Sequence, residues 1–482
     1  MVKAVVGDEA HLKAFEEALS SSSPPPQAQV GLVVGKLSAS SDRALVYSLL
    51  PTPPTEAAAP ACSLRAAPKP KPSSKGKAPT SSDASLEFDV DWIAEHARQV
   101  SRMLLGGMSV IGIYVWASEA SFKATSPAVL SQVTRAASQA WYGRAFTAFT
   151  ERLLIHISYS PRRLACRICE VASGSLRPCD FKYSKLLPSL QTFRCTYNFE
   201  IRLTATQAEP FKKAILKAIS HLTEEVQNAR ALIDGHLFSE DIKISTEGPR
   251  QVDFLVPFKN AVPVEECSLE GVAGLLRFAG SVSALAYLGP KESISEAISD
   301  LKADIITSLR SRLDIILDDA DDGSAANELD QSPSQKVTQV VFHELREPYN
   351  FLFPRRVLIP WFSGSYICDY LQQSETTEDA VDRCKEVIPL ETAAESSSIL
   401  EPERAAACGT LESFWGMVPG ARSGTRDRSS RLKDSGCTGQ ADDDKSRRRQ
   451  GGVNLNILAA LFALLVALIA GFVFTLSAGS NT

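Results

Sequence analysis

The sequence predicts an α+β protein with two folded regions, polar linkers and a single transmembrane helix near its C-terminus. Three observations predict this organisation. Apolar residues follow strand and helix periodicities in alternation as far as residue 390. Two stretches, 51–85 and 391–456, contain few large apolar residues, whereas residues 457–476 are uncharged and almost wholly apolar. The formal net charge of -5 over 482 residues argues against a nucleic-acid-binding protein, because such proteins carry a strong positive field.

Residues 1–235 are expected to form one α+β domain. Its strands show alternating or short continuous apolar runs, and its helices show apolar residues three or four positions apart. Asp91 is a residue type that caps helices, and the pair Gly106-Gly107 is typical of a helix end. The expected elements are a hairpin at 30–35 and 44–50, a helix at 91–105, a strand at 109–116, a helix at 126–141, a hairpin at 152–159 and 164–172, a strand at 192–203 and a helix at 208–233.

Within this domain, residues 51–85 are expected to be a disordered insertion. They include eight prolines and almost no large apolar residue, so they cannot bury enough surface to offset the entropy of ordering. A basic run inside them consists of Lys69, Lys71, Lys75 and Lys77. The run is compatible with contact to RNA or lipid headgroups, but a solvated linker is the favoured interpretation.

Residues 236–390 are expected to form a second α+β domain built from ββα units. Two segments of this region place a Gly-Ser pair between apolar runs and continue into a helical pattern. Two occurrences leave open whether the unit is duplicated or the likeness is coincidental. The expected elements are a strand at 251–258, two strands on either side of Gly280-Ser281, a helix from near Ser293, two strands on either side of Gly364-Ser365 and a helix at 377–388.

Residues 457–476 are expected to form a tail anchor. At a rise of about 1.5 Å per residue, a helix of this length spans roughly the 30 Å hydrocarbon core of a bilayer. Only a short tail, 477–482, follows in this sequence; it is expected in the lumen, with insertion after translation ends. The anchor positions are Ile457, Leu461, Leu465, Leu468, Phe472 and Leu476, and the basic residues before them are Lys445, Arg447, Arg448 and Arg449.

Those basic residues end a tether, 391–456, that is expected to be disordered. Positive charge beside a span favours the cytosolic side, so the body of the protein is expected in the cytosol. The tail lacks the basic residues that often accompany mitochondrial outer-membrane anchors, which favours the endoplasmic reticulum. Inside the tether, the apolar run Phe414-Trp415-Gly416-Met417-Val418 is either a docking peptide or drift in the sequence.

The cysteines and histidines do not form a recognisable metal or catalytic motif. Cys166 and Cys169 are a close pair with Cys179 and Cys195 downstream, but on a strand the two would face opposite sides. Small buried hydrophobic residues are therefore favoured over zinc ligands. The sequence pairs no histidine with a cysteine, and the glycines of 31–36 lie too close together for a phosphate-binding loop. No catalytic residue, metal or cofactor is expected.

A family resemblance is carried first by residues 91–115, which read DWIxEHAxQVxRMLxGGMxVxGIYV. Further matches follow in the same order as in the family: Gly280-Ser281-Val282, Arg355-Arg356-Val357-Leu358-Ile359-Pro360, Cys368-Asp369-Tyr370 and the C-terminal anchor. With these motifs the sequence resembles the odorant response abnormal protein 4 family, over the ordered chain from residue 1 to about 390.

The resemblance implies a non-enzymatic membrane protein. The family is associated with the folding and delivery of a subset of G-protein-coupled odorant receptors, and it pairs with the ubiquitin-fold-modifier-specific cysteine protease at the endoplasmic reticulum. Its N-terminal half resembles a degenerate MPN domain. Catalytic MPN metalloproteases hold zinc through a His-x-His pair at the end of a strand, whereas the corresponding strand here ends Val115-Trp116-Ala117.

The leading hypothesis is a tail-anchored adaptor, which binds the protease and membrane-protein clients such as receptors and concentrates them at the lipid bilayer. Its partner interface is expected on Trp92, His96, Arg102 and Tyr114. The alternative is a cryptic peptidase or modifier-removing hydrolase, with an active site assembled from scattered residues. A plain structural tether without a receptor client is the third hypothesis.

Overall fold

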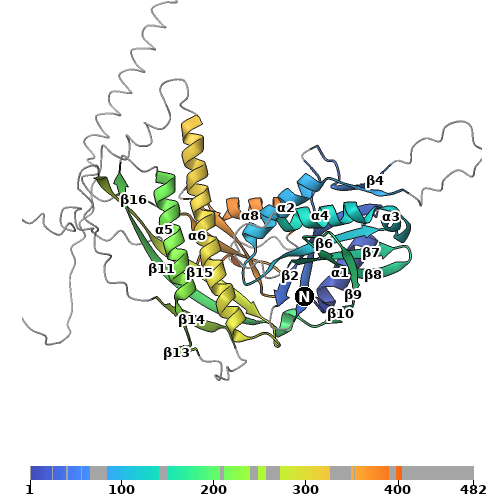
Figure 1. Cartoon of the computed structure of the whole chain (residues 1–482), viewed down its shortest axis with the longest axis horizontal. Coiled ribbons are helices and arrows are strands. Elements are labelled where there is room, and N and C mark those ends of the chain that lie inside the picture. Colours follow the sequence, from blue (N-terminus) through green and yellow to red (C-terminus); the bar gives the residue numbers. More distant parts are fainter. Residues whose placement is uncertain are drawn as a thin grey trace, which may run out of the picture. The chain divides into compact units, whose positions relative to one another are not determined.

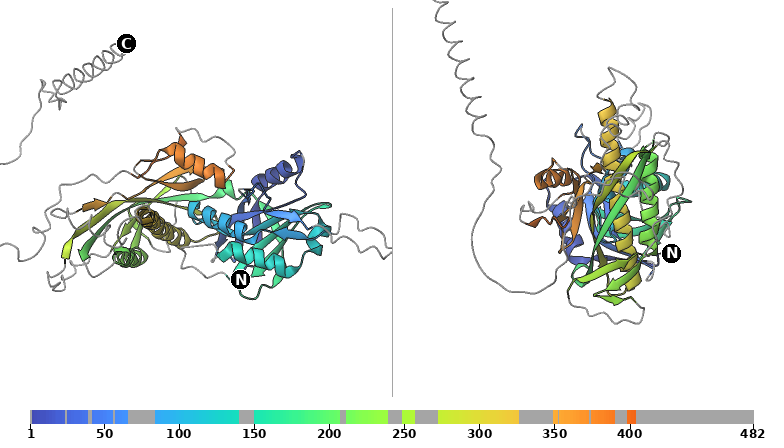
Figure 2. Two further views of the ribbon diagram at one scale, coloured as in Figure 1. Left: turned by 90° about the horizontal axis from the view of Figure 1, so that it is seen from above. Right: turned by 90° about the vertical axis from the view of Figure 1, so that its left-hand side faces the viewer.

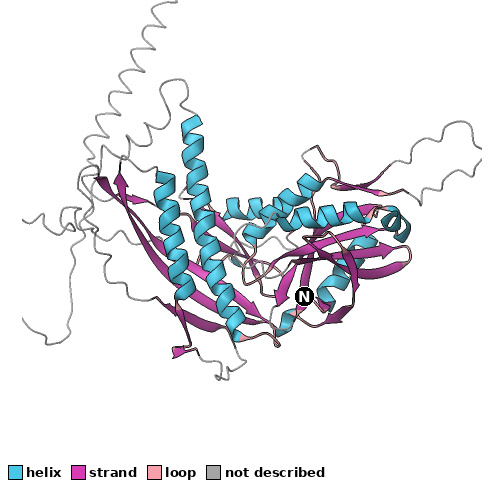
Figure 3. Ribbon diagram, viewed as in Figure 1, coloured by secondary structure: helices cyan, strands magenta, loops and turns pink. Residues whose placement is uncertain are grey.

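The computed structural model describes the chain in stretches. The chain divides into Met1–Arg422 and Ser423–Thr482, and every described residue lies in the first unit. The predicted anchor, its basic flank, the tail at 477–482 and the apolar run at 414–418 lie outside the described residues. The described part is of mixed α+β class, as predicted (Figure 3). The described residues are 2–23, 25–38, 42–55, 57–65, 84–139, 150–206, 211–238, 248–256, 272–325, 349–351, 353–372, 374–389 and 398–403.

An eight-stranded sheet forms the N-terminal part, in the order β10-β1-β3-β2-β6-β7-β8-β9 (Figure 1). The predicted hairpins are confirmed, because β2 pairs antiparallel with β3 and β7 pairs antiparallel with β8. The strands are β1 (Ala4–Asp8), β2 (Ala28–Ser38), β3 (Arg43–Pro51), β6 (Ser109–Ala117), β7 (Glu151–Tyr159), β8 (Arg162–Glu170), β9 (Leu176–Cys179) and β10 (Phe181–Ser184).

Helices cover both faces of this sheet. Leu12 of α1 packs with Tyr114 in one core, and Ile93 of α2 and Val133 of α4 pack with Val115 in another. Helix α2 begins at residue 90 and ends at 103, whereas 91–105 was expected. Its cap is Asp89, whose side chain accepts from the N–H of Trp92, and not Asp91. The helices are α1 (Glu9–Ser21), α2 (Val90–Met103), α3 (Glu119–Ala124) and α4 (Pro127–Gln139), with a 3-10 turn at Leu187–Ser189.

Part of the predicted insertion at 51–85 is folded, so the expectation of disorder is wrong for that part. Strand β4 (Cys62–Leu64) pairs antiparallel with β5 (Leu86–Phe88), and Cys62 is buried. The indole Nε1 of Trp92 donates to the carbonyl oxygen of Pro53 at 2.8 Å. The composition of 51–85 as a whole does not reveal that a few of its residues pair and pack beside α2. Residues 66–83 lie outside the described residues.

A six-stranded sheet forms the second part, in the order β13-β12-β14-β11-β15-β16. Helices α5 and α6 pack on one of its faces (Figure 2), where Ile219 of α5 and Ile305 of α6 share one core with Phe193. The elements are β11 (Gln191–Thr206), α5 (Phe211–Asn228), β12 (Arg230–Ile233), β13 (His236–Leu237), β14 (Arg250–Leu255), β15 (Val272–Leu288), α6 (Ile294–Ala325) and β16 (Tyr349–Phe351).

The division expected at residue 235 does not separate the two sheets. Strand β11, which was assigned to the N-terminal domain, pairs with β15 along its whole length. The helix expected at 208–233 ends at Asn228, and 230–233 form β12 instead. Sequence-local patterns identified most of these elements but not their long-range pairing. The likeness of residues 1–235 to an MPN domain remains a prediction.

Only one of the two expected ββα units is present among the described residues. Gly280 and Ser281 pair with Phe199 and Asn198 inside the continuous strand β15, so they form no turn. The second unit is confirmed as a hairpin and helix, and Gly364 takes a positive φ of 76° in its turn. Its elements are β17 (Arg355–Pro360), β18 (Tyr366–Leu371) and α8 (Thr377–Val387).

Gly106 connects the end of α2 to the second sheet. Its carbonyl oxygen accepts from the N–H of Tyr287 at 2.9 Å, and it forms a parallel bridge with Ala286. A second link is made by Lys36 of β2, whose Nζ lies 2.7 Å from Oδ2 of Asp300 on α6. The two sheets are therefore joined by a backbone hydrogen bond and by a buried ion pair.

We predict that Gly106→Ala destabilises the protein more than Gly364→Ala. Both glycines have positive φ, 71° and 76°, where an alanine costs about 1–2 kcal/mol. A Cβ at Gly106 would also overlap the ring of Tyr287, whereas one at Gly364 meets nothing within 4 Å. Overpacking adds about 1–3 kcal/mol to the loss at Gly106. Denaturant unfolding measures both losses, and equal losses would contradict the predicted contact.

Candidate functional site

The edge of β15 facing away from β11 is closed mainly by side chains. Strand β16 pairs only with residues 276–278 of β15. We call residues 281–287 the β15 edge. Its bonds are Arg312 Nη1 to Ser281 O at 3.2 Å, Ser283 N to Glu403 Oε1 at 2.8 Å, Arg356 Nη1 to Ser283 O at 3.1 Å, Leu285 N to Asp304 Oδ2 at 3.2 Å and Tyr287 N to Gly106 O at 2.9 Å.

The charged side chains at this edge also pair with one another, and we call Asp304, Arg312, Arg356 and Glu403 the edge seal. Arg356 binds Asp304 through two parallel bonds of 2.9 and 3.0 Å. Arg312 Nη2 donates to Glu403 Oε1 at 2.6 Å. Burial lowers the pKa of Arg356, but the attraction of Asp304 outweighs it, so the pKa lies well above its usual value. Arg356 is therefore held as a buried cation.

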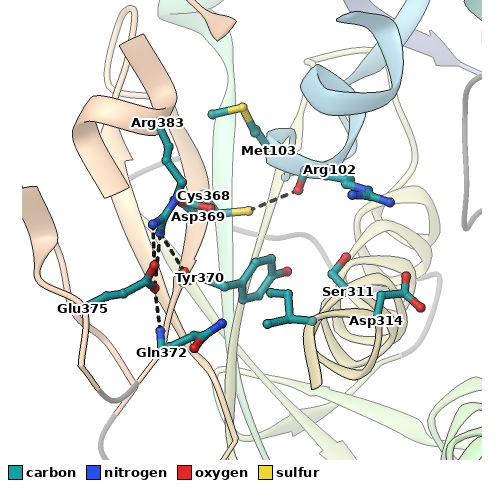
Figure 4. Close-up of a pocket in the computed structure, with 11 residues that line it drawn as sticks. Arg102, Met103, Ser311, Asp314, Cys368, Asp369, Tyr370, Gln372, Glu375 and Arg383 are labelled. Atoms are coloured by element: carbon teal, nitrogen blue, oxygen red, sulfur yellow. Dashed lines mark hydrogen bonds and ion pairs between the residues drawn. The ribbon is translucent and has the colours of Figure 1, made fainter. Parts of the chain in front are cut away.

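A cavity of about 300 Å³ lies beside the edge seal (Figure 4). Arg383 binds Asp369 through Nε at 2.9 Å and Glu375 through Nη1 at 2.6 Å, so two carboxylates of the cavity wall share one positive charge. Burial raises the pKa of Asp369 although Arg383 opposes the shift. The lining residues come from α2, α6, β18, α8 and the β18–α8 loop: Arg102, Met103, Ser311, Asp314, Ile315, Cys368, Asp369, Tyr370, Gln372, Glu375 and Arg383.

Cys368 is the one thiol in the wall of this cavity. Its Sγ lies 3.7 Å from the carbonyl oxygen of Arg102, and burial raises its pKa to about 11. A thiol with this pKa is protonated at neutral pH and is a poor nucleophile. The arrangement suits binding of a polar group between fixed charges, and no group of histidine, cysteine or carboxylate side chains among the described residues is placed to hold a metal ion.

The structure separates the four residues expected to form a partner interface. Arg102 is exposed at the end of α2 and lines the cavity, and Trp92 is half-buried near the start of the same helix. His96 is 3% exposed and Tyr114 is 0% exposed. His96 and Tyr114 therefore cannot form part of an exposed surface in this structure, so the expectation is wrong for those two residues.

His96 is a link between distant segments instead. Its Nδ1 lies 3.2 Å from the hydroxyl oxygen of Thr52, and its Nε2 lies 2.9 Å from the carbonyl oxygen of Val387 in α8. A neutral ring that donates from Nε2 and accepts at Nδ1 satisfies both contacts. Burial lowers the pKa of His96 to about 4, so the ring is neutral at pH 7.

The cysteine cluster does not assemble into one site. Cys166 and Cys169 are both buried on β8, and Cys179 lies opposite Cys166 on β9. Cys195 belongs to β11 in the other sheet. Burial raises the pKa of the Cys166 thiol. The favoured interpretation as small buried residues agrees with these positions.

The edge seal was not identified from the sequence. Asp304 and Arg312 lie eight residues apart on α6, within a run of apolar residues of its inner face. The sequence signal for the edge seal was the presence of these two charged residues on the otherwise apolar inner face of α6. Their partners Arg356 and Glu403 are too distant in sequence for any local pattern to pair them.

We predict that His96 makes the protein sensitive to mild acid. The unfolded ring takes up a proton below its ordinary pKa of 6.5, whereas the folded ring does so only near 4. The stability linked to His96 is thus present above pH 6.5 and is lost as the pH falls towards 4. Between pH 7 and 5 the loss is about 2 kcal/mol.

His96→Gln removes this contribution, so its unfolding free energy should fall about 2 kcal/mol less than that of the wild type over the same interval. Urea unfolding at pH 7 and 5 measures the difference. His221→Gln serves as the matched control, because His221 is exposed. Equal acid sensitivity in His96→Gln and the wild type would contradict the predicted linkage.

Comparison with known proteins identifies the family. Proteins described as "Protein odr-4 homolog" from Mus musculus and Homo sapiens are 25% and 27% identical to this chain, covering 77% and 74% of it and 80% and 77% of their own lengths. The crystal structure of UfSP from C. elegans matches with a TM-score of 0.34 and 8% identity, over 80% of this chain and 57% of that chain. The family model described as "Odorant response abnormal 4-like" matches residues 31–399, and the chain therefore belongs to the ODR4-like family.

Proposed function

We propose that this protein is a tail-anchored adaptor at the endoplasmic reticulum, which holds a ubiquitin-fold-modifier-specific protease and membrane-protein clients such as receptors at the bilayer. The observation that carries the proposal is the uncharged apolar run at 457–476, joined to the folded body by a polar tether. None of the helices in the described ranges is long and apolar enough to cross a membrane, and 457–476 lie outside those ranges.

The charges before the run support cytosolic placement of the body. Residues 421–452 contain nine lysines and arginines against five acidic residues, and Arg447, Arg448 and Arg449 lie closest to the span. Basic residues next to a span favour the cytosolic side and are attracted to the anionic cytosolic leaflet. The tether thus becomes positive where it approaches the proposed membrane surface.

A binding role, and not a catalytic one, is supported by the thiols. Each of the seven cysteines in the described ranges has its pKa raised, and in each case burial is the largest cause. Catalytic cysteines need the opposite environment, with a nearby cation or histidine that stabilises the thiolate. These thiols instead serve as small apolar side chains in the cores.

The protease-binding surface is proposed at the exposed end of α2. Arg102 lies there, and the cavity that it lines brings α6, β18 and α8 to the same place. An exposed arginine beside a concave, polar surface is typical of interface hot spots. Trp92, half-buried against Pro53, contributes to the same helix but lies near its other end.

Deletion of 457–476 should move the protein from the membrane fraction to the supernatant, while capture of the protease is unchanged. The physical reason is loss of the segment that is proposed to occupy the hydrocarbon core. Fractionation followed by affinity capture measures both effects. Deletion of 421–440, a segment of equal length within the tether, is the control and should leave the protein in the membrane fraction. Membrane retention after deletion of 457–476 would contradict the anchor.

Arg102→Ala should weaken binding of the purified protease to the full chain in detergent by at least about fivefold, since truncating an arginine at an interface hot spot costs more than about 1 kcal/mol. Arg98→Ala, one turn earlier on α2, should leave the affinity unchanged. Equal affinities for both variants would contradict the proposed surface.

Turnover of a modifier fusion by the chain alone, together with stoichiometric zinc, would favour the hydrolase and contradict the adaptor.

A further inference from the structure

Residues 398–403 lie on the folded body as a short segment, in which Leu400 forms an antiparallel bridge with Leu358. The N–H of Leu358 donates to the carbonyl oxygen of Leu400 at 2.8 Å, and the N–H of Leu400 donates to the carbonyl oxygen of Leu358 at 2.9 Å. Strand β17 pairs with β18 on its other side. The segment therefore adds to the outer edge of the β17–β18 hairpin at one position, as peptide ligands do in β-augmentation.

Only the end of this segment is fully buried. Glu403 is 3% exposed, whereas Leu400 is 39% exposed, and Glu401 and Pro402 are also exposed. A strand that belongs to a core buries alternate side chains along its length. The contacts of this segment include two backbone hydrogen bonds at Leu400, the buried side chain of Glu403, the exposed ion pair of Glu401 with Arg355 and partial packing of Ile399 on the core. Bound peptides are usually held in the same way, by backbone hydrogen bonds to a strand edge and by a side chain in a pocket.

The pocket for Glu403 selects a carboxylate. Oε1 accepts from Arg312 Nη2 at 2.6 Å and from the N–H of Ser283 at 2.8 Å, and Oε2 accepts from the N–H of Arg356 at 2.7 Å. All three partners are donors, so an amide in place of the carboxylate would point an N–H group at a donor or lose a bond. The guanidinium of Arg312 is 2% exposed and supplies the charge that compensates the anion.

We propose that the outer edge of β17, together with Arg312 and Ser283, forms a binding cleft for an extended acidic peptide, and that 398–403 are its internal occupant. An extended segment of a partner protein replaces residues 398–403 when that segment has a glutamate three residues after the residue that pairs with Leu358. The cleft exchanges occupants and does not stand empty, because a buried arginine without a carboxylate is strongly unfavourable. The inference does not depend on the proposed membrane anchor.

Competition with a probe peptide tests the proposal. The probe is a fluorescein-labelled peptide with the sequence of residues 397–404, and the protein is the full chain in detergent. In the chain carrying Glu403→Ala the segment has lost its anchoring carboxylate and Arg312 has lost its counter-charge, so this chain should bind the probe at least about tenfold more tightly than the wild type does. The wild type binds weakly because its own segment is present at millimolar effective concentration. Equal binding by both chains, or none by Glu403→Ala, would overturn the proposal.

Two altered probes separate the pocket from general charge attraction. Glutamine in place of the glutamate corresponding to Glu403 should weaken binding at least about tenfold. Glutamine in place of the glutamate corresponding to Glu401 is the matched control and should bind as the parent probe does, because Glu401 pairs only with the exposed Arg355 among the described residues. Equal weakening by the two changes would overturn the carboxylate pocket.

Hydrogen exchange in the unaltered chain gives a readout that does not depend on folding of the variant. At about 5 mM probe, above the effective concentration of a linked segment, exchange of the Leu400 amide should accelerate while the amide of Leu358 remains protected. The two results together mean that the probe has replaced the internal segment on β17. Unchanged exchange at Leu400, or loss of protection at Leu358, would overturn the proposal.

Discussion

The free edge of β15 is the constraint on which the rest of the folded body depends. A buried backbone N–H or C=O group without a partner costs about 1–3 kcal/mol, and a bare strand edge also pairs readily with other chains. Between Ser281 and Tyr287, partners come from α6, β17, the 398–403 segment and Gly106. These segments, which are far apart in the sequence, must meet at one place because that edge requires them there.

Closing an edge with charged side chains adds a second constraint. Each buried charge needs an opposite charge, and removing one member of such a pair costs about 3–5 kcal/mol. The edge seal contains two arginines and two carboxylates, so its charges balance. Tyr370 joins it through a bond of 3.2 Å from Arg356, and the same tyrosine lines the cavity. The position of the cavity wall therefore follows from the arginines that close β15.

Local patterns predict the elements whose hydrogen bonds are made by neighbours in the sequence. The hairpins β2–β3, β7–β8 and β17–β18 are of this kind, and all three are confirmed. Apart from the cap of α2, the errors share a cause, which is a partner distant in sequence. Gly280-Ser281 suits a turn, but pairing with β11 keeps it within strand β15. The first residues of the insertion expected at 51–85 are ordered because Trp92 donates a hydrogen bond to Pro53. His96 reads as an outer residue of its helix because nothing nearby in sequence indicates that α8 covers it.

The same long-range pairing limits what the cavity beside α2 is able to bind. Its carboxylates at Asp369 and Glu375 share one partner, Arg383, and burial keeps the Cys368 thiol protonated. Net charge thus offers little attraction, and the wall offers no activated nucleophile. A ligand gains affinity there chiefly by fitting the shape of the cavity and by replacing hydrogen bonds that its wall already makes. Shape and hydrogen bonding, more than charge, therefore select what this cavity binds.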